Sequence, residues 1–248
     1  MAFPTLGSVE AIYRDEVAVH AAIHQAFTES VQASPALRRH RDHVEQNNLG
    51  FGDRAFHWLW KLLVDAMPVP FRFLEIGVFK GQVVSLVGML ALQTGKDAFV
   101  FGITPLNGDG DKYLTFDPAT DYAAAIRDLQ DWSGIPLSRQ ARILCGHSTD
   151  DGIKAACRSL APFDLVYIDG CHDFHAVVND IIVYGELVRP GGYLVMDDAS
   201  TDLQLPPDMF SGIADVVEAC RRVLEPDARF APVCAVGHNR VWRRQVAA

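Results

Sequence analysis

The chain has 248 residues, of which 49% are hydrophobic, enough to build the core of one large domain. Its net charge of -9 argues against a nucleic-acid partner, because such proteins present clustered positive charge to the phosphate backbone. No apolar run reaches the ~18 residues of a membrane span, no secretory signal pattern opens the chain, and the cysteines form no CxxC pair. We therefore expect a cytoplasmic protein with reduced cysteines and no membrane partner.

The first 48 residues are expected to be helical and distinct from the rest of the chain. Ser8 is placed to cap a first helix, whose apolar stripe comprises Ile12, Val19, Ile23 and Phe27. Pro35 takes the first position of a second, charged helix. We predict that residues 1–48 form a helical appendage to a main domain of residues 49–248. The appendage can serve as a lid over an active site, form the face of a homo-oligomer, or simply pack on the main domain.

The main domain begins with an amphipathic helix capped by Asp53, followed by a first strand at Phe71–Val78. The strand runs into a loop, EIGVFKG, and then into another helix. Glycine after a strand allows a tight turn and close approach of a ligand, and the helix that follows offers free N–H groups. The motif lacks the second glycine of GxGxxG, and Glu75 precedes its first glycine. It therefore predicts a ligand with a positive group rather than a dinucleotide pyrophosphate.

The second strand is expected at Ala98–Ile103, followed by a polar loop over residues 104–121. In that loop Asn107, Asp109 and Asp111 alternate as in a calcium site, but no glutamate follows at the required position. A loop near the sheet edge is therefore favoured over a calcium site. A helix, a short third strand and another helix are expected at residues 121–132, 142–145 and 146–160.

The most informative stretch is residues 163–200, FDLVYIDGCHDFHAVVNDIIVYGELVRPGGYLVMDDAS. Two short apolar runs end at Asp169 and at Asp197–Asp198, and the amphipathic helix between them is expected to end at Pro190. A strand–helix–strand unit is almost always a right-handed crossover, which makes the strands parallel and brings their carboxyl ends to one sheet edge. Asp169 and Asp197 can then share one ion or one substrate, at the edge where open α/β sheets bind ligands.

The chain is expected to close with a helix over residues 210–223 and an antiparallel hairpin. The hairpin strands are Phe230–Val236 and Arg240–Arg243, and the turn between them contains His238, to which the sequence assigns no role. Strands and helices alternate five times before this pair. The pattern predicts a doubly wound, Rossmann-like α/β fold with a mostly parallel sheet.

Three of these motifs, EIGVFKG, YIDGCHDFHAVVNDI and PGGYLVMDD, resemble those of the class I S-adenosylmethionine-dependent methyltransferases. The likeness extends over roughly residues 71–243. It is strongest to small-molecule O-methyltransferases such as the cephalosporin-hydroxylation and macrolide-sugar enzymes, many of which use a divalent metal. It implies S-adenosylmethionine as the cofactor, with Ser148 near the adenine and the methionine part held by Glu75, Gly77, Gly81 and Gln82. It also implies a metal, most simply Mg²⁺, held by Asp169, Asp197 and Asp198.

The residue types agree with metal-assisted chemistry. Carboxylates suit hard cations such as Mg²⁺, which leave positions for substrate oxygens; a hydroxyl held there becomes more acidic and is oriented for attack on a sulfonium methyl. His172 lies three residues after Asp169 and suits a general base, or it hydrogen-bonds the start of the helix. Asp197 and Asp198 both reach an ion only if the chain leaves strand geometry there; otherwise Asp198 caps a turn.

One position departs from the family pattern. The second strand of this fold usually ends in an acid that binds the ribose hydroxyls, and here Thr104 stands at that end. Three alternatives follow: ribose recognition comes from Thr104, it comes from the loop around Asp109–Asp111, or it is weakened.

The sequence thus predicts a metal-assisted O-methyltransferase acting on a hydroxylated small molecule, such as a sugar or a natural-product scaffold. Two alternatives stay open. The first is other chemistry of the same cofactor, because a fold does not fix the reaction. The second is a binding module without turnover. A nicotinamide oxidoreductase is disfavoured by the incomplete glycine motif.

Overall fold

The computed structural model describes residues 5–107, 112–113 and 116–246. One seven-stranded sheet lies at its centre, in the order β3-β2-β1-β4-β5-β7-β6. Its strands are β1 (Phe71–Ile76), β2 (Ala98–Thr104), β3 (Arg142–Cys145), β4 (Phe163–Ile168), β5 (Val188–Met196), β6 (Phe230–Val236) and β7 (Asn239–Arg244). Strands β1 to β5 pair in parallel, whereas β7 is antiparallel to both β5 and β6. This confirms the predicted Rossmann-like sheet with a C-terminal antiparallel hairpin.

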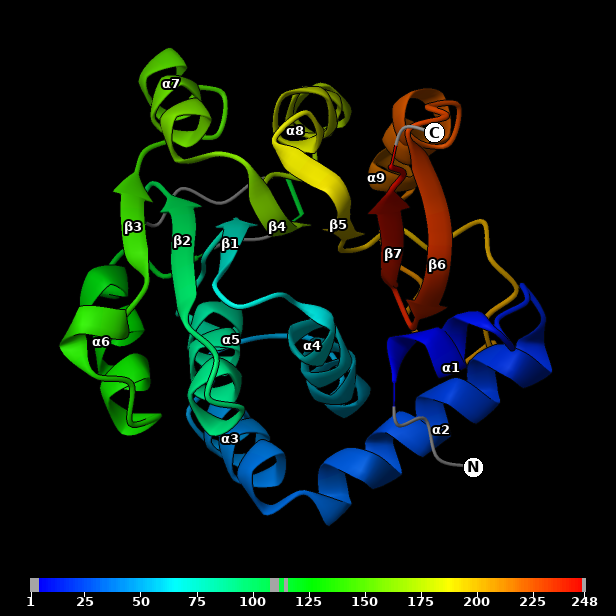
Figure 1. Cartoon of the computed structure of the whole chain (residues 1–248), viewed down its shortest axis with the longest axis horizontal. Helices are drawn as coiled ribbons and strands as arrows, with labels where there is room; N and C mark the ends of the chain where they lie inside the picture. Colours follow the sequence, from blue (N-terminus) through cyan, green and yellow to red (C-terminus); the bar gives the residue numbers. More distant parts are fainter. Residues whose placement is uncertain (1–4, 108–111, 114–115, 247–248) are drawn as a thin grey trace.

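Helices cover both faces of the sheet (Figure 1). One face carries α7 (Asp151–Leu160), α8 (Phe174–Gly185) and α9 (Ala214–Ala219), the last continued by a π-helical turn, Cys220–Leu224. The other carries α4 (Arg54–Ala66), α5 (Gln82–Gln93) and α6 (Tyr122–Trp132), and a 3-10 turn, Leu137–Arg139, precedes β3. Each face buries its own apolar core. Among the described residues, no helix is both long and apolar enough to cross a membrane.

The N-terminal helices form a further layer beneath α4 and α5 (Figure 1). They are α1 (Leu6–Glu10), α2 (Val17–Ala33) and α3 (Pro35–Gln46). Ile23, Phe27 and Leu37 are almost completely buried, in the same apolar core as α4 and the sheet. The N-terminal region therefore packs against the main domain.

Three expected helix boundaries are wrong. The first N-terminal helix is capped by Thr5 and ends at Glu10. Helix α2 begins at Val17, after a segment in which Asp15 accepts hydrogen bonds from His20 and from the backbone N–H of Gln204. Helix α8 ends at Gly185, and Pro190 lies within β5, since the chain joins the sheet as early as Val188. The helix expected over residues 210–223 begins only at Ala214.

A buried polar network joins three helices. His40 of α3 lies between His57 of α4, with Nδ1 and Nε2 2.9 Å apart, and Ser85 of α5, with Nε2 and Oγ 3.0 Å apart. Burial lowers the pKa of His40 to about 3 and holds the pKa of His57 well below its usual value. Both rings are therefore neutral in the folded protein near neutral pH.

This network predicts an acid-sensitive fold. As the pH falls below about 6.5, the unfolded chain binds protons that the folded rings exclude, so the free energy of unfolding decreases, by about 2 kcal/mol per histidine at pH 5. Urea unfolding at pH values from 5 to 8 measures this slope. His40→Gln should flatten it, whereas exposed His175→Gln should leave it unchanged. An unchanged slope in His40→Gln would contradict the assignment.

Candidate active site

Three acidic side chains lie together at the edge of the sheet where the parallel strands β4 and β5 end. The backbone N–H of Asp197 donates to the carbonyl of Ile168 at 3.0 Å, so the ends of β4 and β5 lie side by side. The hydroxyl of Tyr167 donates to Oδ2 of Asp169 at 3.1 Å. Asp198 has a φ of +52°, so the chain does leave strand geometry directly after β5. Asp169, Asp197 and Asp198 consequently line one cavity together.

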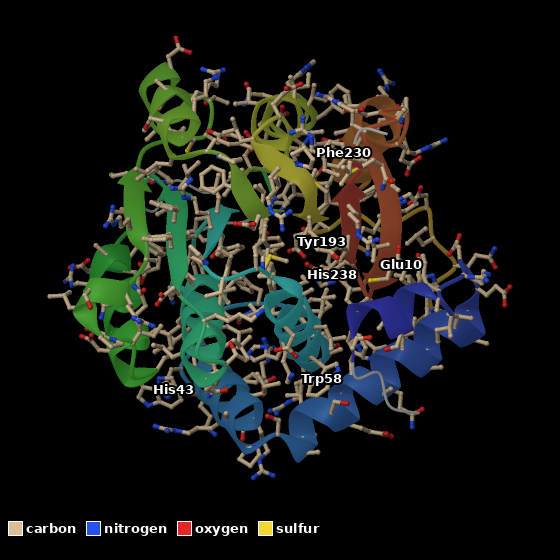
Figure 2. All side chains as sticks on the ribbon, in the orientation of Figure 1. Glu10, His43, Trp58, Tyr193, Phe230 and His238 are labelled. Carbon is tan, nitrogen blue, oxygen red and sulfur yellow. The ribbon has the colours of Figure 1, made fainter. Side chains whose placement is uncertain are left out.

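Two histidines border these carboxylates. Nε2 of His172 lies 3.2 Å from Oδ2 of Asp198. Nε2 of His238 lies 3.4 Å from Oδ1 of Asp197 and 3.9 Å from Oδ1 of Asp198. Figure 2 shows His238 at the end of the β6–β7 hairpin, beside α4. Asp197, Asp198 and His238 each offer a ligand atom, and these atoms lie within 4.8 Å of one another.

Sequence reasoning missed His238, although a signal was available. An antiparallel hairpin beside β5 must bring its turn to the edge where β5 ends, and Met196 indeed pairs with Arg240 at the start of β7. A histidine in that turn therefore lies beside Asp169, Asp197 and Asp198, which we call the acidic cluster.

The charges of this cluster are poorly compensated. Burial and the carboxylates of Asp197 and Asp198 raise the pKa of Asp169 well above its usual range. Burial and Asp198 also raise the pKa of Asp197, opposed by His238. The buried Oδ1 of Asp197 accepts no hydrogen bond from the described residues. Such a group of oxygen donors fits a hard divalent cation, which would neutralise it.

A second cavity of about 440 Å³ lies beyond the ends of β1, β2 and β4. Gly77, Thr104 and Asp169 all line it. Gly77 has a φ of +97°, and a Cβ built there would lie 1.8 Å from the carbonyl oxygen of Asp169. Gly81, also at positive φ, is the N-cap residue of α5. The EIGVFKG loop thus makes the tight turn and close backbone approach expected of it.

Glu75, Gly77 and Gln82 line a narrow extension of these cavities, about 50 Å³ in volume. The Glu75 side chain accepts a hydrogen bond from the backbone N–H of Val84, but its buried Oε2 has no partner among the described residues. Burial raises the pKa of Glu75 to about 8, and the charge of Asp197 adds to the effect. An unpaired buried carboxyl group fits a cationic ligand such as an amino group.

Glu75→Gln should therefore stabilise the free protein while weakening its cofactor binding. The unfolded carboxyl ionises near pH 4.5 and the folded one near 8, so burying Glu75 costs stability that grows as the pH rises between these values. We expect a gain of about 1–3 kcal/mol at pH 8, which disappears below pH 4.5. Thermal unfolding and S-adenosylhomocysteine titration measure the two effects. A variant that is less stable at pH 8, or that binds as well as wild type, would contradict this role.

Thr104 and Ser148, two of the predicted cofactor contacts, differ in their relation to the 440 Å³ cavity. Thr104 is buried and lines the 440 Å³ cavity, where its Oγ1 accepts the N–H of Leu106 at 3.3 Å. The hydroxyl of Ser148 instead donates to Asp180 at 3.0 Å, and the neighbouring His147 lines the cavity. The adenine contact of Ser148 remains a prediction. Asp109 and Asp111 lie outside the described residues.

The cavity lined by all three carboxylates has a volume of about 590 Å³ and adjoins the 440 Å³ cavity. It combines the acidic cluster with apolar walls from Phe56, Met209, Phe210 and Ile213. Three residues, Phe51, Asp169 and His172, line both this cavity and the 440 Å³ cavity. The two cavities therefore meet at Asp169 and His172, with Asp197 and Asp198 in the wall of the 590 Å³ cavity. This arrangement suits transfer of a group from one bound molecule to another.

Known proteins share this fold and part of this sequence. The chain is 25% identical over 180 residues to an uncharacterized protein of Acanthamoeba polyphaga mimivirus, covering 71% of this chain and 72% of the relative. An O-methyltransferase from Bacillus cereus in complex with S-adenosylhomocysteine has a TM-score of 0.58 at 15% identity, covering 89% of this chain and 97% of that one. MycE, a methyltransferase of mycinamycin biosynthesis in complex with Mg and S-adenosylhomocysteine, has a TM-score of 0.53 at 20% identity. The match covers 86% of this chain and 55% of that one.

The family itself is identified from the sequence. A family described as a methyltransferase domain matches residues 74–199, just over half of the 248 residues. The matched segment begins in β1 and ends just after Asp198, so it includes the glycine loop and all three carboxylates. The chain therefore belongs to this methyltransferase family and is an S-adenosylmethionine-dependent methyltransferase.

Proposed function

We propose that the protein is an O-methyltransferase that uses a divalent cation, most simply Mg²⁺, to methylate a hydroxyl group of a small molecule. One observation carries the proposal: Asp169 lines both cavities, Asp197 and Asp198 line the 590 Å³ cavity beside it, and the glycine loop borders the 440 Å³ cavity proposed for the cofactor. The Mg in the MycE complex supports the choice of metal.

The cofactor is proposed to occupy the 440 Å³ cavity and its narrow extension. Glu75 would accept the cofactor's ammonium group, and the backbone at Gly77 leaves room for the chain to pass close to Asp169. Thr104 is the candidate for the ribose, since its hydroxyl lies at the end of β2. The acceptor is proposed to occupy the 590 Å³ cavity, whose aromatic and aliphatic walls favour an acceptor with an apolar body, such as a natural-product scaffold, over a bare sugar.

The chain's own residues would position the acceptor hydroxyl and receive its proton. Asp197, Asp198 and His238, together with Asp169, would hold the cation, which would lower the pKa of an acceptor hydroxyl. His172 lines both cavities, and its Nε2 is oriented by Asp198 at 3.2 Å, so it is the candidate general base. Alignment of the acceptor oxygen with the methyl group supplies the remainder of catalysis.

Product analysis tests the proposal. The protein is incubated with methyl-labelled S-adenosylmethionine and a panel of hydroxylated sugars, catechols and polyketide scaffolds, with Mg²⁺ or with EDTA. We expect a methylated acceptor and S-adenosylhomocysteine only when Mg²⁺ is present. Methylthioadenosine without a methylated acceptor would favour other cofactor chemistry. Equal transfer in EDTA would exclude the role of the cation.

A further inference from the structure

The segment between α3 and α4, residues 49–53, forms a wall shared by the cavities of the site. Phe51 lines the 440 Å³ cavity, the 590 Å³ cavity and the narrow extension at Glu75. Phe51 is 58% exposed, and its ring stacks on that of Phe79, which also lines the 440 Å³ cavity, with ring centroids 5.0 Å apart. This wall lies outside regular secondary structure, so other groups must fix its position.

Arg41 of α3 is the main group that fixes this wall. Its Nη1 donates to the carbonyl of Phe51 at 3.0 Å, and its Nη2 donates to the carbonyl of Gly52 at 2.5 Å. Its Nε donates to Glu45 at 2.7 Å, which orients the guanidinium group from behind. Arg41 is only 5% exposed, so these bonds are shielded from water.

The same guanidinium group reaches the glycine loop. Nη1 of Arg41 also approaches Oε1 of Gln82 at 3.3 Å, and Nε2 of Gln82 donates to the carbonyl of Phe51 at 3.1 Å. Gln82 is the first residue of α5, directly after the EIGVFKG loop, and it lines the extension at Glu75. One buried cation thus ties the N-terminal layer, the Phe51 wall and the start of α5 together. The planar guanidinium group offers five N–H donors in a fixed arrangement, which suits these simultaneous contacts. A lysine side chain cannot make the same set of hydrogen bonds.

We propose that Arg41 is a positioning residue for cofactor binding: it holds the Phe51 wall and Gln82 in the geometry that closes the cofactor cavity. The inference rests on the proposed occupancy of that cavity by S-adenosylmethionine. It assigns to the N-terminal helices a direct part in cofactor affinity, through a residue that does not line any of the three cavities described above.

The test compares Arg41→Ala with Arg38→Ala, an exposed arginine on the same helix. Hydrogen exchange of residues 49–53 is measured in the free proteins, and S-adenosylhomocysteine is titrated by calorimetry with and without millimolar guanidinium. We expect Arg41→Ala to speed exchange of the segment, to weaken S-adenosylhomocysteine binding by about tenfold or more, and to recover part of the affinity with guanidinium. Arg38→Ala should match wild type in all three measurements. The rescue separates positioning from general destabilisation, since guanidinium does not repair a damaged core.

The outcomes distinguish this inference from the proposed function. Unchanged exchange in Arg41→Ala, or faster exchange with unchanged affinity, would overturn the role of Arg41 while leaving the cofactor site intact. Weaker affinity that guanidinium does not restore would also overturn it. If wild type itself binds no S-adenosylhomocysteine, the proposed cofactor site fails, and the role of Arg41 fails with it.

Discussion

Asp197→Asn is expected to lower the rate of methyl transfer about 10³-fold while leaving S-adenosylhomocysteine binding within a few fold of wild type. Asp197 lies at the centre of the acidic cluster, next to Asp169, Asp198 and His238, and its buried Oδ1 has no hydrogen bond from the described residues. An amide in its place keeps the shape but removes the charge that a hard cation requires. The loss corresponds to about 4 kcal/mol of transition-state stabilisation.

Mn²⁺ binding is measured by electron paramagnetic resonance, and initial rates of methyl transfer are measured on an acceptor identified in the product screen. Asp208→Asn is the matched control, because Asp208 is an exposed carboxylate on the neighbouring segment beside Met209. The unliganded Asp197→Asn protein should be at least as stable as wild type, since the substitution removes one of several crowded carboxylates. Full activity in Asp197→Asn would rule out a cation held by this residue.

Gly77→Ala is expected to abolish cofactor binding and to destabilise the fold by about 3–5 kcal/mol. The added Cβ would lie 1.8 Å from the carbonyl oxygen of Asp169, which is backbone and cannot rotate away, and the φ of +97° is itself unfavourable for alanine. Relief of the overlap must separate the loops after β1 and β4, so the cofactor cavity and the carboxylate of Asp169 are displaced together.

Thermal unfolding and S-adenosylhomocysteine titration provide the two readouts. Gly152→Ala is the control, because Gly152 lies in α7 with nothing within 4 Å of a new Cβ, and alanine favours a helix there. The contrast with Glu75→Gln is informative: that variant should lose affinity while gaining stability. A Gly77→Ala protein with wild-type stability would show that the two loops are not packed as described.

The sequence was most informative where local pattern and topology point the same way. Short apolar runs that end in Asp169 and Asp197, joined by an amphipathic helix, were enough to bring both carboxylates to one edge, because the handedness of such a unit is almost fixed. The glycine loop followed from its place after the first strand. The predicted strands all exist, because buried parallel strands leave a continuous apolar run that few other elements imitate.

Features that depend on contacts between distant segments could not be predicted. Arg41 belongs to the helix predicted to be charged, and only the folded chain shows that its side chain is buried and donates to the carbonyls of residues 51 and 52. The hydroxyl of Ser148 donates to Asp180, which lies 32 residues further along the chain, while the adjacent His147 lines the 440 Å³ cavity. The sequence alone does not reveal this hydrogen bond. The topology of the hairpin predicts where His238 lies, but only the structure shows that it is close enough to Asp197 and Asp198 to be a candidate metal ligand.

Calorimetric titration of S-adenosylmethionine into the wild-type protein, in Mg²⁺ and in EDTA, tests whether the 440 Å³ cavity is the cofactor site. We expect micromolar binding in both solutions, because Glu75 and the glycine loop, rather than the cation, are proposed to hold the cofactor. We also expect that subsequent methyl transfer requires Mg²⁺. Absence of binding in both solutions would contradict the assignment of the 440 Å³ cavity to the cofactor and would leave the acidic cluster without a methyl donor.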